Sequence, residues 1–408
     1  MRTKSIKNNK IINDPIYGFI DIPDNEILEI INHKYFQRLR RISQLGLAYL
    51  VFPGAYHTRF NHAIGCMHLM KQSINLLKSK NIKITYNEEK ASMIAILLHD
   101  IGHGPFSHAL EYSILQKITH EELSLMYMKE LNNQFAKKLD LAIKIFENKY
   151  KKKFLHQLIS GVIDLDRMDY LKRDSFYTGV IEGNINVDRI IKMLNIHDNN
   201  LVVEEKGIYS IDKFLKSREI MYWQVYYHKN VLVAEKMLIS ILKRIKNTKS
   251  IKNLPEYISF FIDNKYNKKE IKKIIENFSK IDDSDIIYHI KQMINNEDNI
   301  LSFLCKSLIK RELFKIKTQN KQFKAKEIEK IKNAICKKFK ISEKESNYLL
   351  FKGTIKNKSV NKKIQIINKS NKIETINTYE RKKIFSNIKK STQNTYYVCY
   401  PKEIEVIL

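Results

Sequence analysis

A nearly continuous apolar helix that ends in a histidine–aspartate pair constrains this chain more than any other feature. The stretch Asn87–Leu98 begins with a capping asparagine and two glutamates, which suit the positive end of a helix, and residues 91–98 are apolar on almost every face. Such a helix belongs inside a protein. It ends at His99 and Asp100, and the glycines and proline of residues 101–106 predict an irregular turn. The fold must bury this helix and accommodate a polar pair at its end.

Histidines concentrate around this pair. Seven of the twelve histidines fall within 64 residues: His57, His62, His68, His99, His103, His108 and His120. Ionisable groups at the end of an apolar helix are costly unless they are paired or bind a metal. We therefore predict a divalent cation bound by His99 and Asp100.

The remaining ligands must come from elsewhere in the chain. His62 opens a second apolar stretch, in which Gly65 would let another helix approach closely. A carboxylate would complete the set, because nitrogen and oxygen together suit a Lewis-acidic, water-activating ion. The candidate segment is Asp164–Asp174, where Asp166, Asp169 or Tyr170, and Arg173 or Asp174 share a helix face.

The four cysteines do not suggest a metal site or a disulfide framework. Cys66, Cys305, Cys336 and Cys399 are far apart along the chain and form no paired-cysteine motif. We expect any metal to be held by other residues.

The scarcity of glycine and proline, 11 and 6 residues, predicts a mainly α fold. We expect a helical core with a small hairpin, followed by a C-terminal helical and α+β lobe, with domains at residues 1–240, 241–340 and 341–408. Helices are predicted at 26–41, 87–98, 155–171 and 212–242, a hairpin from 201–204 and 207–210, lysine-rich amphipathic helices over 250–340, and strands at 348–351, 363–367 and 395–400.

The net charge of +29 is concentrated at the C-terminal side. Residues 1–240 hold 34 Lys+Arg against 26 Asp+Glu, whereas residues 241–408 hold 39 against 18. Such a field attracts polyanions such as nucleic acid, but an Ile-, Asn- and Lys-rich composition typical of an AT-rich genome accounts for it without a ligand. The chain has no apolar run long enough to span a bilayer and no signal peptide at its start, so we expect a soluble cytoplasmic protein without membrane contacts.

The motifs resemble those of the HD-domain metal-dependent phosphohydrolases. His62, His99 with Asp100, and Asp166 resemble the H…HD…D signature of that family. Further segments, in order across residues 10–240, resemble the branch of this family that contains deoxynucleoside triphosphate (dNTP) triphosphohydrolases. They are residues 13–18, 35–40, 44–46, 52–55, 57–62, 98–108 and 169–174.

This resemblance implies one divalent metal per site, held by His62, His99, Asp100 and Asp166, with Mg, Mn, Fe, Zn and Ni not distinguished. It implies hydrolysis of a dNTP to the deoxynucleoside and inorganic triphosphate. His120 matches the family's proton-donating histidine and Glu111 its supporting carboxylate. Phosphate contacts fall to His103, His108, Arg59, Arg167 and Arg218, sugar contacts to Gln44, Leu45 and Asp174, and aromatic contacts beside sugar and base to Tyr170 and Tyr226.

The resemblance also implies a homo-oligomer, a dimer or tetramer, with a second nucleotide between subunits. Lys10, Asn13, Gln37 and Arg40 resemble parts of that regulatory site. Asn32 stands where guanine-reading members have aspartate, and an amide cannot make the same paired guanine contact. The basic segment Arg381–Lys390 could serve this site, an acidic partner, or neither.

Two other functions are compatible with the sequence. The same metal site could act on a different phosphoester: a nucleoside monophosphate, a cyclic dinucleotide or a guanosine alarmone. Alternatively, the basic C-terminal region could make this a nucleic-acid-binding protein with a regulatory HD site. The intact set of His62, His99, Asp100 and Asp166 argues against a vestigial site.

Overall fold

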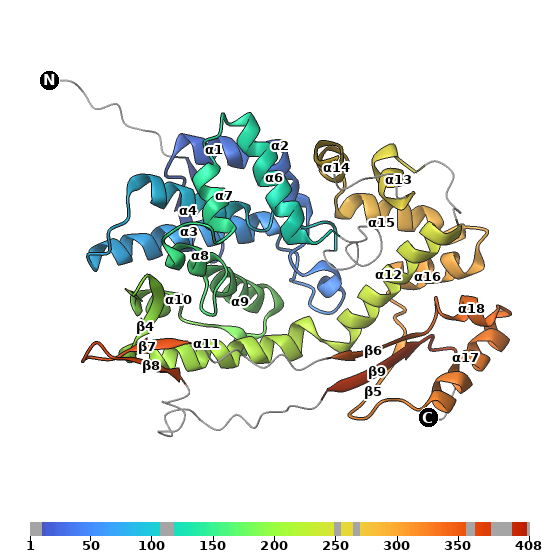
Figure 1. The fold of residues 1–408 in the computed structure, drawn as a ribbon. Coiled ribbons are helices and arrows are strands. Elements are labelled where there is room, and N and C mark those ends of the chain that lie inside the picture. The colour runs from blue at the N-terminus through green and yellow to red at the C-terminus, as the bar shows by residue number, and fades with distance from the viewer. Residues whose placement is uncertain are drawn as a thin grey trace.

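Three helices that carry or adjoin the predicted metal ligands pack together in the N-terminal part of the fold. They are labelled α3 (Arg59–Ser79), α4 (Tyr86–Leu98) and α9 (Leu165–Thr178) in Figure 1. The computed structural model describes residues 10–106, 118–248, 254–263, 270–355, 364–376 and 394–405. Helix α3 packs against both α4 and α9. Residues 91–98 of α4 are all buried, as the sequence predicts for a helix that is apolar on almost every face. No described helix is long and apolar enough to cross a membrane.

Helix α4 begins one residue earlier than predicted, and Thr85 rather than Asn87 is its cap. The Thr85 hydroxyl accepts a hydrogen bond from the Glu88 amide at 3.2 Å, and the Glu88 carboxylate accepts one from the Thr85 amide at 2.8 Å. This reciprocal pair satisfies two N–H groups at the helix start.

The core contains shorter helices than the sequence predicts. The predicted helix 26–41 is interrupted at His33, whose extended backbone lets its ring cap the next helix through the Tyr35 amide. The predicted helix 155–171 is interrupted before Asp164, which caps α9. The remaining core helices are α1 (Asn25–Asn32), α2 (Lys34–Gln37), α6 (His120–Gln134), α7 (Asp140–Phe146), α8 (Lys153–Ile159) and α10 (Val187–Lys192), with 3₁₀ turns at Arg38–Arg41, Gly46–Leu50, Ile181–Gly183 and Glu205–Gly207.

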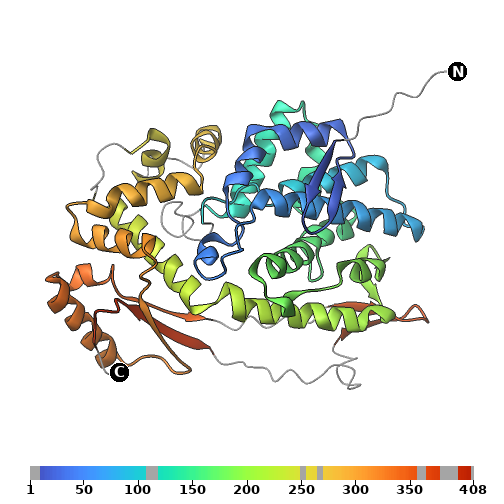
Figure 2. The same ribbon diagram turned by 180° about the vertical axis from the view of Figure 1, so that it is seen from behind.

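The predicted helix 212–242 consists of two helices joined by a π-helical turn. Helix α11 (Ile208–Met221) leads into the π turn (Tyr222–Tyr226) and then into α12 (Lys229–Thr248). The two helices run along one side of the core and reach the C-terminal region (Figures 1 and 2). π-helical turns often occur at functional sites.

The C-terminal region combines helices with a three-stranded antiparallel sheet. Its described helices are α13 (Glu256–Ile262), α14 (Ile271–Phe278), α15 (Asp283–Gln292), α16 (Asn299–Ile309), α17 (Ala325–Phe339) and α18 (Glu343–Ser346), with a 3₁₀ turn at Met293–Asn295. In the sheet, β9 (Thr395–Tyr400) lies between β5 (Lys315–Gln319) and β6 (Phe351–Ile355), with Cys399 opposite Ile316 and Phe351. The strand β5 corrects the prediction of helices alone over 250–340.

Two smaller sheets lie beside the core. An N-terminal hairpin joins β1 (Ile11–Asp14) to β2 (Gly18–Asp21). The predicted hairpin of 201–204 with 207–210 is wrong, because β4 (Asn200–Glu204) pairs with β3 (Leu194–His197) and residue 208 begins α11. β4 also pairs in parallel with β7 (Gln365–Ile367), and β8 (Ile373–Thr375) completes this sheet at the opposite end of α11 from the β5–β9–β6 sheet (Figure 1). The predicted fold class, mainly α with small sheets, is confirmed.

Candidate metal centre and active site

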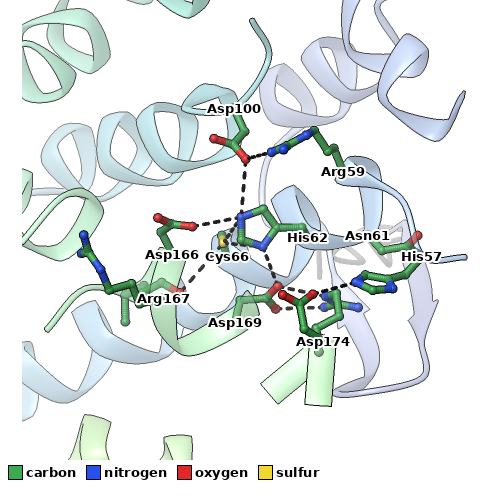
Figure 3. Close-up of polar contacts among 12 residues, drawn as sticks. His57, Arg59, Asn61, His62, Cys66, Asp100, Asp166, Arg167, Asp169 and Asp174 are labelled. Atoms are coloured by element: carbon green, nitrogen blue, oxygen red, sulfur yellow. Dashed lines mark hydrogen bonds and ion pairs between the residues drawn. The ribbon is translucent and has the colours of Figure 1, made fainter. Parts of the chain in front are cut away.

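The structure brings the four predicted metal ligands together from three helices. Figure 3 shows three of them, His62, Asp100 and Asp166. His62 lies in the first turn of α3, His99 and Asp100 at the end of α4, and Asp166 in the first turn of α9. His62 Nε2 is 3.1 Å from Asp166 Oδ1 and 3.8 Å from Asp100 Oδ2. His99 Nε2 is 3.4 Å from Asp100 Oδ1 and 3.5 Å from Asp166 Oδ1.

The hydrogen bonding of His99 fits a metal ligand. Its Nδ1 lies 2.6 Å from the carbonyl oxygen of Ile96, so Nδ1 carries the hydrogen and donates it. The other ring nitrogen, Nε2, is buried and makes no hydrogen bond. A buried acceptor without a partner is costly, and a cation between His99, Asp100 and Asp166 would satisfy it.

Cys66 also belongs to this cluster, which the sequence analysis did not anticipate. One ligand atom each from His62, Cys66, His99 and Asp166 lie within 4.8 Å of one another. Ligand bonds of about 2.0–2.3 Å hold ligand atoms at comparable separations around one ion. Cys66 follows His62 by one turn of α3, and its Sγ is 3.5 Å from His62 Nδ1. Burial raises the pKa of this thiol, so Cys66 is protonated in this structure.

Both carboxylates of the centre are ionised. Burial of Asp100 opposes ionisation, but His99, His103 and the guanidinium of Arg59 hold its pKa well below the usual value. Arg59 forms an ion pair with Asp100. Burial is likewise outweighed at Asp166, where the adjacent rings of His62 and His99 lower the pKa of the carboxyl. The centre therefore presents two negative charges to a cation.

A second carboxylate behind His62 orients its ring. His62 Nδ1 lies 2.7 Å from Asp169 Oδ2, so Nδ1–H donates to Asp169 and Nε2 faces the cluster. Burial would raise the pKa of Asp169, but Arg173 and His62 lower it to about 2. The predicted close approach at Gly65 is confirmed, since a Cβ there would lie 2.1 Å from Asp169 Oδ1. Helical spacing in the sequence predicts the face on which Asp169 lies, but no pattern in the sequence indicates its contact with His62.

Two stacked histidines extend the site away from the cluster. The rings of His103 and His120 lie 4.1 Å apart at 20°, and His103 Nε2 is 3.4 Å from Asp100 Oδ1. Burial and the nearby charge of Arg59 lower the pKa of His103 to about 3, so this ring is neutral near pH 7. His120 is the first residue of α6, and a quarter of its side chain is exposed. Glu111, His108 and the segment Arg381–Lys390 lie outside the described residues.

The predicted sugar and base contacts gather around Asp174. This buried carboxylate accepts hydrogen bonds from His57 Nε2 and from the Tyr226 hydroxyl, each at 2.7 Å. The ring of Tyr170 stands edge-on to Tyr226, 6.0 Å away. Gln44 lies near Asp174 through His57, because the backbone amide of Gln44 donates a hydrogen bond to the His57 carbonyl at 3.0 Å. Its side-chain oxygen is buried and makes no hydrogen bond, and Leu45 beside it is half-buried.

The three predicted phosphate-binding arginines have different partners. Arg59 lies beside the cluster of predicted metal ligands and forms an ion pair with Asp100. Arg167 follows Asp166 directly, but its guanidinium donates to the Gly161 carbonyl at 2.6 Å and pairs with Asp164 at the cap of α9. Arg218 is half-buried over the ring of Tyr222.

The predicted regulatory residues lie at the surface of the N-terminal segment. Lys10 directly precedes β1, Asn13 lies in β1 and Asn32 ends α1, and all three residues are exposed. Gln37 is half-buried, and its Oε1 accepts a hydrogen bond from Arg40 Nε at 2.9 Å. The guanidinium of Arg40 lies 3.6 Å from the ring centre of Phe60.

The C-terminal region contributes contacts to the site that no local sequence pattern could predict. Asp283, the first residue of α15, accepts hydrogen bonds from the Ser43 amide at 2.8 Å and the Phe106 amide at 3.2 Å. Fully buried Arg38 donates to the carbonyls of Ile101, His103 and Ile281. These contacts fix the turn after His99 and the segment before Gln44.

Comparisons with known proteins agree with this site. The HD domain family matches residues 59–174, and the HD associated region matches residues 185–258. A crystal structure of a phosphohydrolase from Bacteroides thetaiotaomicron is 43% identical, covers 96% of this chain and 99% of its own, and has a TM-score of 0.91. The uncharacterized protein YwfO of Bacillus subtilis is 35% identical over 76% of this chain and 72% of its own length.

A relative with a described activity matches over a shorter stretch. The deoxynucleoside triphosphate triphosphohydrolase SAMHD1 homolog of Dictyostelium discoideum is 33% identical over 55% of this chain and 47% of its own length. The fold and the site are those of a mainly helical protein of the HD phosphohydrolase class, with a cluster of side chains that could hold a metal ion. This chain belongs to the HD-domain phosphohydrolase family.

Proposed function

We propose that this protein is a metal-dependent hydrolase that converts a dNTP to the deoxynucleoside and inorganic triphosphate. The observation that carries the proposal is the convergence of His62, His99, Asp100 and Asp166, with a buried and unpartnered Nε2 on His99. The SAMHD1 homolog supports the choice of substrate.

The metal would be held by these two imidazoles and two carboxylates, with Cys66 close by. A divalent cation held there would lower the pKa of a bound water and polarise a phosphoryl oxygen. Arg59 offers a fixed positive charge beside Asp100 for an anionic substrate. His103 can donate a hydrogen bond to a phosphate oxygen without changing its own charge, because its ring is neutral.

His120 would protonate the departing 5′-oxygen. It stacks on His103 and remains partly exposed, so it can exchange protons with solvent and reach a bound substrate. Histidine suits this role because its ordinary pKa lies near neutrality. Glu111 is proposed to support this step, and His108 is proposed to contact a phosphate.

The deoxyribose would be read by Gln44 and Asp174. The free acceptor of Gln44 and the oxygens of Asp174 can accept a hydrogen bond from a 3′-hydroxyl. Leu45 would crowd a 2′-hydroxyl, and Tyr170 and Tyr226 would line the sugar and base. Arg167 and Arg218 are proposed as further phosphate contacts, for which Arg167 would exchange Asp164 for substrate.

A panel of the four dNTPs, alone and in pairs, with Mn²⁺ or Mg²⁺ tests this function. Separation of the phosphate products should show triphosphate and deoxynucleoside. Release of orthophosphate or pyrophosphate instead, or turnover of only a monophosphate, cyclic dinucleotide or alarmone, would assign the site to another phosphoester. Asp166→Ala should bind no metal at the centre and show no turnover; activity retained in this variant would contradict the ligand assignment.

The nucleotide pairs also test regulation. If Lys10, Asn13, Asn32, Gln37 and Arg40 bind a second nucleotide, one dNTP should accelerate hydrolysis of another. The proposed homo-oligomer predicts a mass of two or four chains by light scattering, increased by the activating nucleotide.

A further inference from the structure

A continuous chain of buried charged side chains connects the metal centre to the N-terminal hairpin. It begins at His62, passes through Asp169 and Arg173, and ends at Asp14 on β1. His62, Asp169 and Arg173 are 0% exposed, and Asp14 is 3% exposed. The residues come from α3, α9 and β1, and Asp14 lies outside the segment 59–174 that matches the HD domain.

Each link of this chain is a short, well-defined contact. Arg173 Nε and Nη2 donate to the two oxygens of Asp169, each at 2.9 Å. Arg173 Nη1 donates to Asp14 Oδ2 at 2.8 Å. Asp14 Oδ1 accepts from the amides of Ile16 and Tyr17, at 2.9 and 3.1 Å, so the turn of the hairpin fixes this carboxylate.

The charges leave a negative end facing His62. Two carboxylates surround one guanidinium, so the group Asp14–Arg173–Asp169 carries one net negative charge. Its contact with His62 is the Nδ1–H bond to Asp169. A carboxylate in this position fixes the tautomer of a metal-binding histidine and makes its other nitrogen a stronger ligand.

We propose that Asp169, Arg173 and Asp14 are positioning residues for the metal ligand His62, and that the β1–β2 hairpin is a structural part of the metal centre. Asp169 orients the ring, Arg173 holds Asp169 by both oxygens, and Asp14 holds Arg173 from the hairpin. This inference deepens the proposed function and rests on metal binding at His62.

A matched network elsewhere in the chain separates this role from simple stabilisation. Arg244 on α12 also lies between two carboxylates, 2.7 Å from Asp298 and 3.1 Å from Glu345. The guanidinium of Arg244 contacts Asp298, Glu345 and the ring of Tyr348, none of which is a histidine. Loss of Asp298 therefore reports what breaking such a network does to stability alone.

The test is Mn²⁺ binding by calorimetry, with thermal melting, for the full-length wild type and the variants Asp169→Asn, Asp14→Asn, Asp14→Glu and Asp298→Asn. We expect Asp169→Asn to weaken Mn²⁺ binding by about 10–100-fold. Asp14→Asn should weaken it less, and Asp14→Glu, which keeps the charge, should recover part of the loss. Asp298→Asn should melt earlier but bind Mn²⁺ as the wild type does.

Several outcomes would overturn the inference. The inference fails if folded Asp14→Asn binds Mn²⁺ as tightly as the wild type, or if Asp298→Asn weakens Mn²⁺ binding as much as Asp14→Asn does. In either case the network of Asp169, Arg173 and Asp14 only stabilises the fold. If Asp169→Asn does not fold, the comparison of Asp14→Asn with Asp14→Glu still decides the question. A wild-type protein that binds no Mn²⁺, Mg²⁺, Fe²⁺, Zn²⁺ or Ni²⁺ would instead contradict the proposed function.

Discussion

The N-terminal core and the C-terminal region use charged side chains in different ways. The core has the smaller net charge, yet it buries Asp14, Asp164, Asp169, Arg173 and Asp174 completely or nearly so and directs several of them toward one centre. The C-terminal region holds most of the excess lysine, and most of its described lysines are exposed. The difference teaches that buried polar groups, not total charge, locate the site.

One C-terminal residue departs from this division. Asp283 lies close enough to the core to hold the amides of Ser43 and Phe106. The C-terminal region therefore also shapes the site, through the Asp283 carboxylate and the Ile281 carbonyl. Substitutions matched between the two regions can test this comparison.

The largest expected effect is on turnover, when a histidine of the core is replaced and a histidine of the C-terminal region serves as the control. His120→Ala should reduce turnover by about 10²–10⁴-fold, because the leaving group loses its proton donor, while metal content stays unchanged. His289→Ala, a half-buried histidine on α15, should leave turnover unchanged. Steady-state kinetics and metal analysis check both variants; equal rates for His120→Ala and the wild type would remove His120 from the mechanism.

The next largest effect is expected from alanine substitutions at two glycines, one in each region. An added Cβ at Gly65 would lie 2.1 Å from Asp169 Oδ1 and 2.3 Å from Arg173 Nη2, and one at Gly353 would lie 2.4 Å from the Tyr397 hydroxyl. Overpacking should cost each alanine variant about 1–3 kcal/mol of stability. Only Gly65→Ala should also weaken metal binding. Denaturant melts and Mn²⁺ titrations distinguish them, and unchanged Mn²⁺ affinity in Gly65→Ala would contradict the expected displacement of Asp169.

Asp283 sharpens the comparison within the C-terminal region. Asp283→Ala leaves the amides of Ser43 and Phe106 without an acceptor, and Asp298→Ala leaves those of Ile300 and Leu301 without one. Each variant should lose about 1–3 kcal/mol of stability. Asp283→Ala alone should raise KM or lower kcat, since Gln44 and His103 adjoin the released segments. Identical kinetics in both variants would restrict Asp283 to a structural role.

The smallest expected effect is on how the stability of the protein changes at acidic pH. Burial would raise the pKa of Glu88, but Lys152, Tyr150 and the Thr85 amide lower it from 4.5 to about 2. Because the folded-state pKa is depressed, the stabilisation is complete above about pH 4.5 and is lost as the pH falls toward 2. Glu88→Gln should flatten the pH dependence of the melting temperature over this range.

In the C-terminal region the residue that corresponds to Glu88 in this comparison is Glu345. Contacts with Ser342 and Arg244 lower its pKa, but the side chain is 35% exposed. Glu345→Gln should therefore change the acid melting curve less than Glu88→Gln. An equal or larger change would show that burial does not separate the two regions in this respect.

Local patterns in the sequence determined much of the core. The apolar residues 91–98 require burial, and His99 and Asp100 must then find partners at the helix end, as they do. The element types were also predictable for β9, whose bounds match, and for α4, which differs by one residue at its start. Helix interruptions at His33 and Asp164 were missed because side-chain caps, which depend on backbone conformation, override the periodicity.

The tertiary structure alone decided which distant side chains meet. Asp14 reaches Arg173 across 159 positions, Asp283 reaches Ser43 across 240, and β4 pairs with β7. No periodicity links such residues, because the packing of helices and strands sets their distances. The sequence supplied the types of ligand for a divalent cation, and the packing of α3 against α9 at Gly65 decided how one of them, His62, is held.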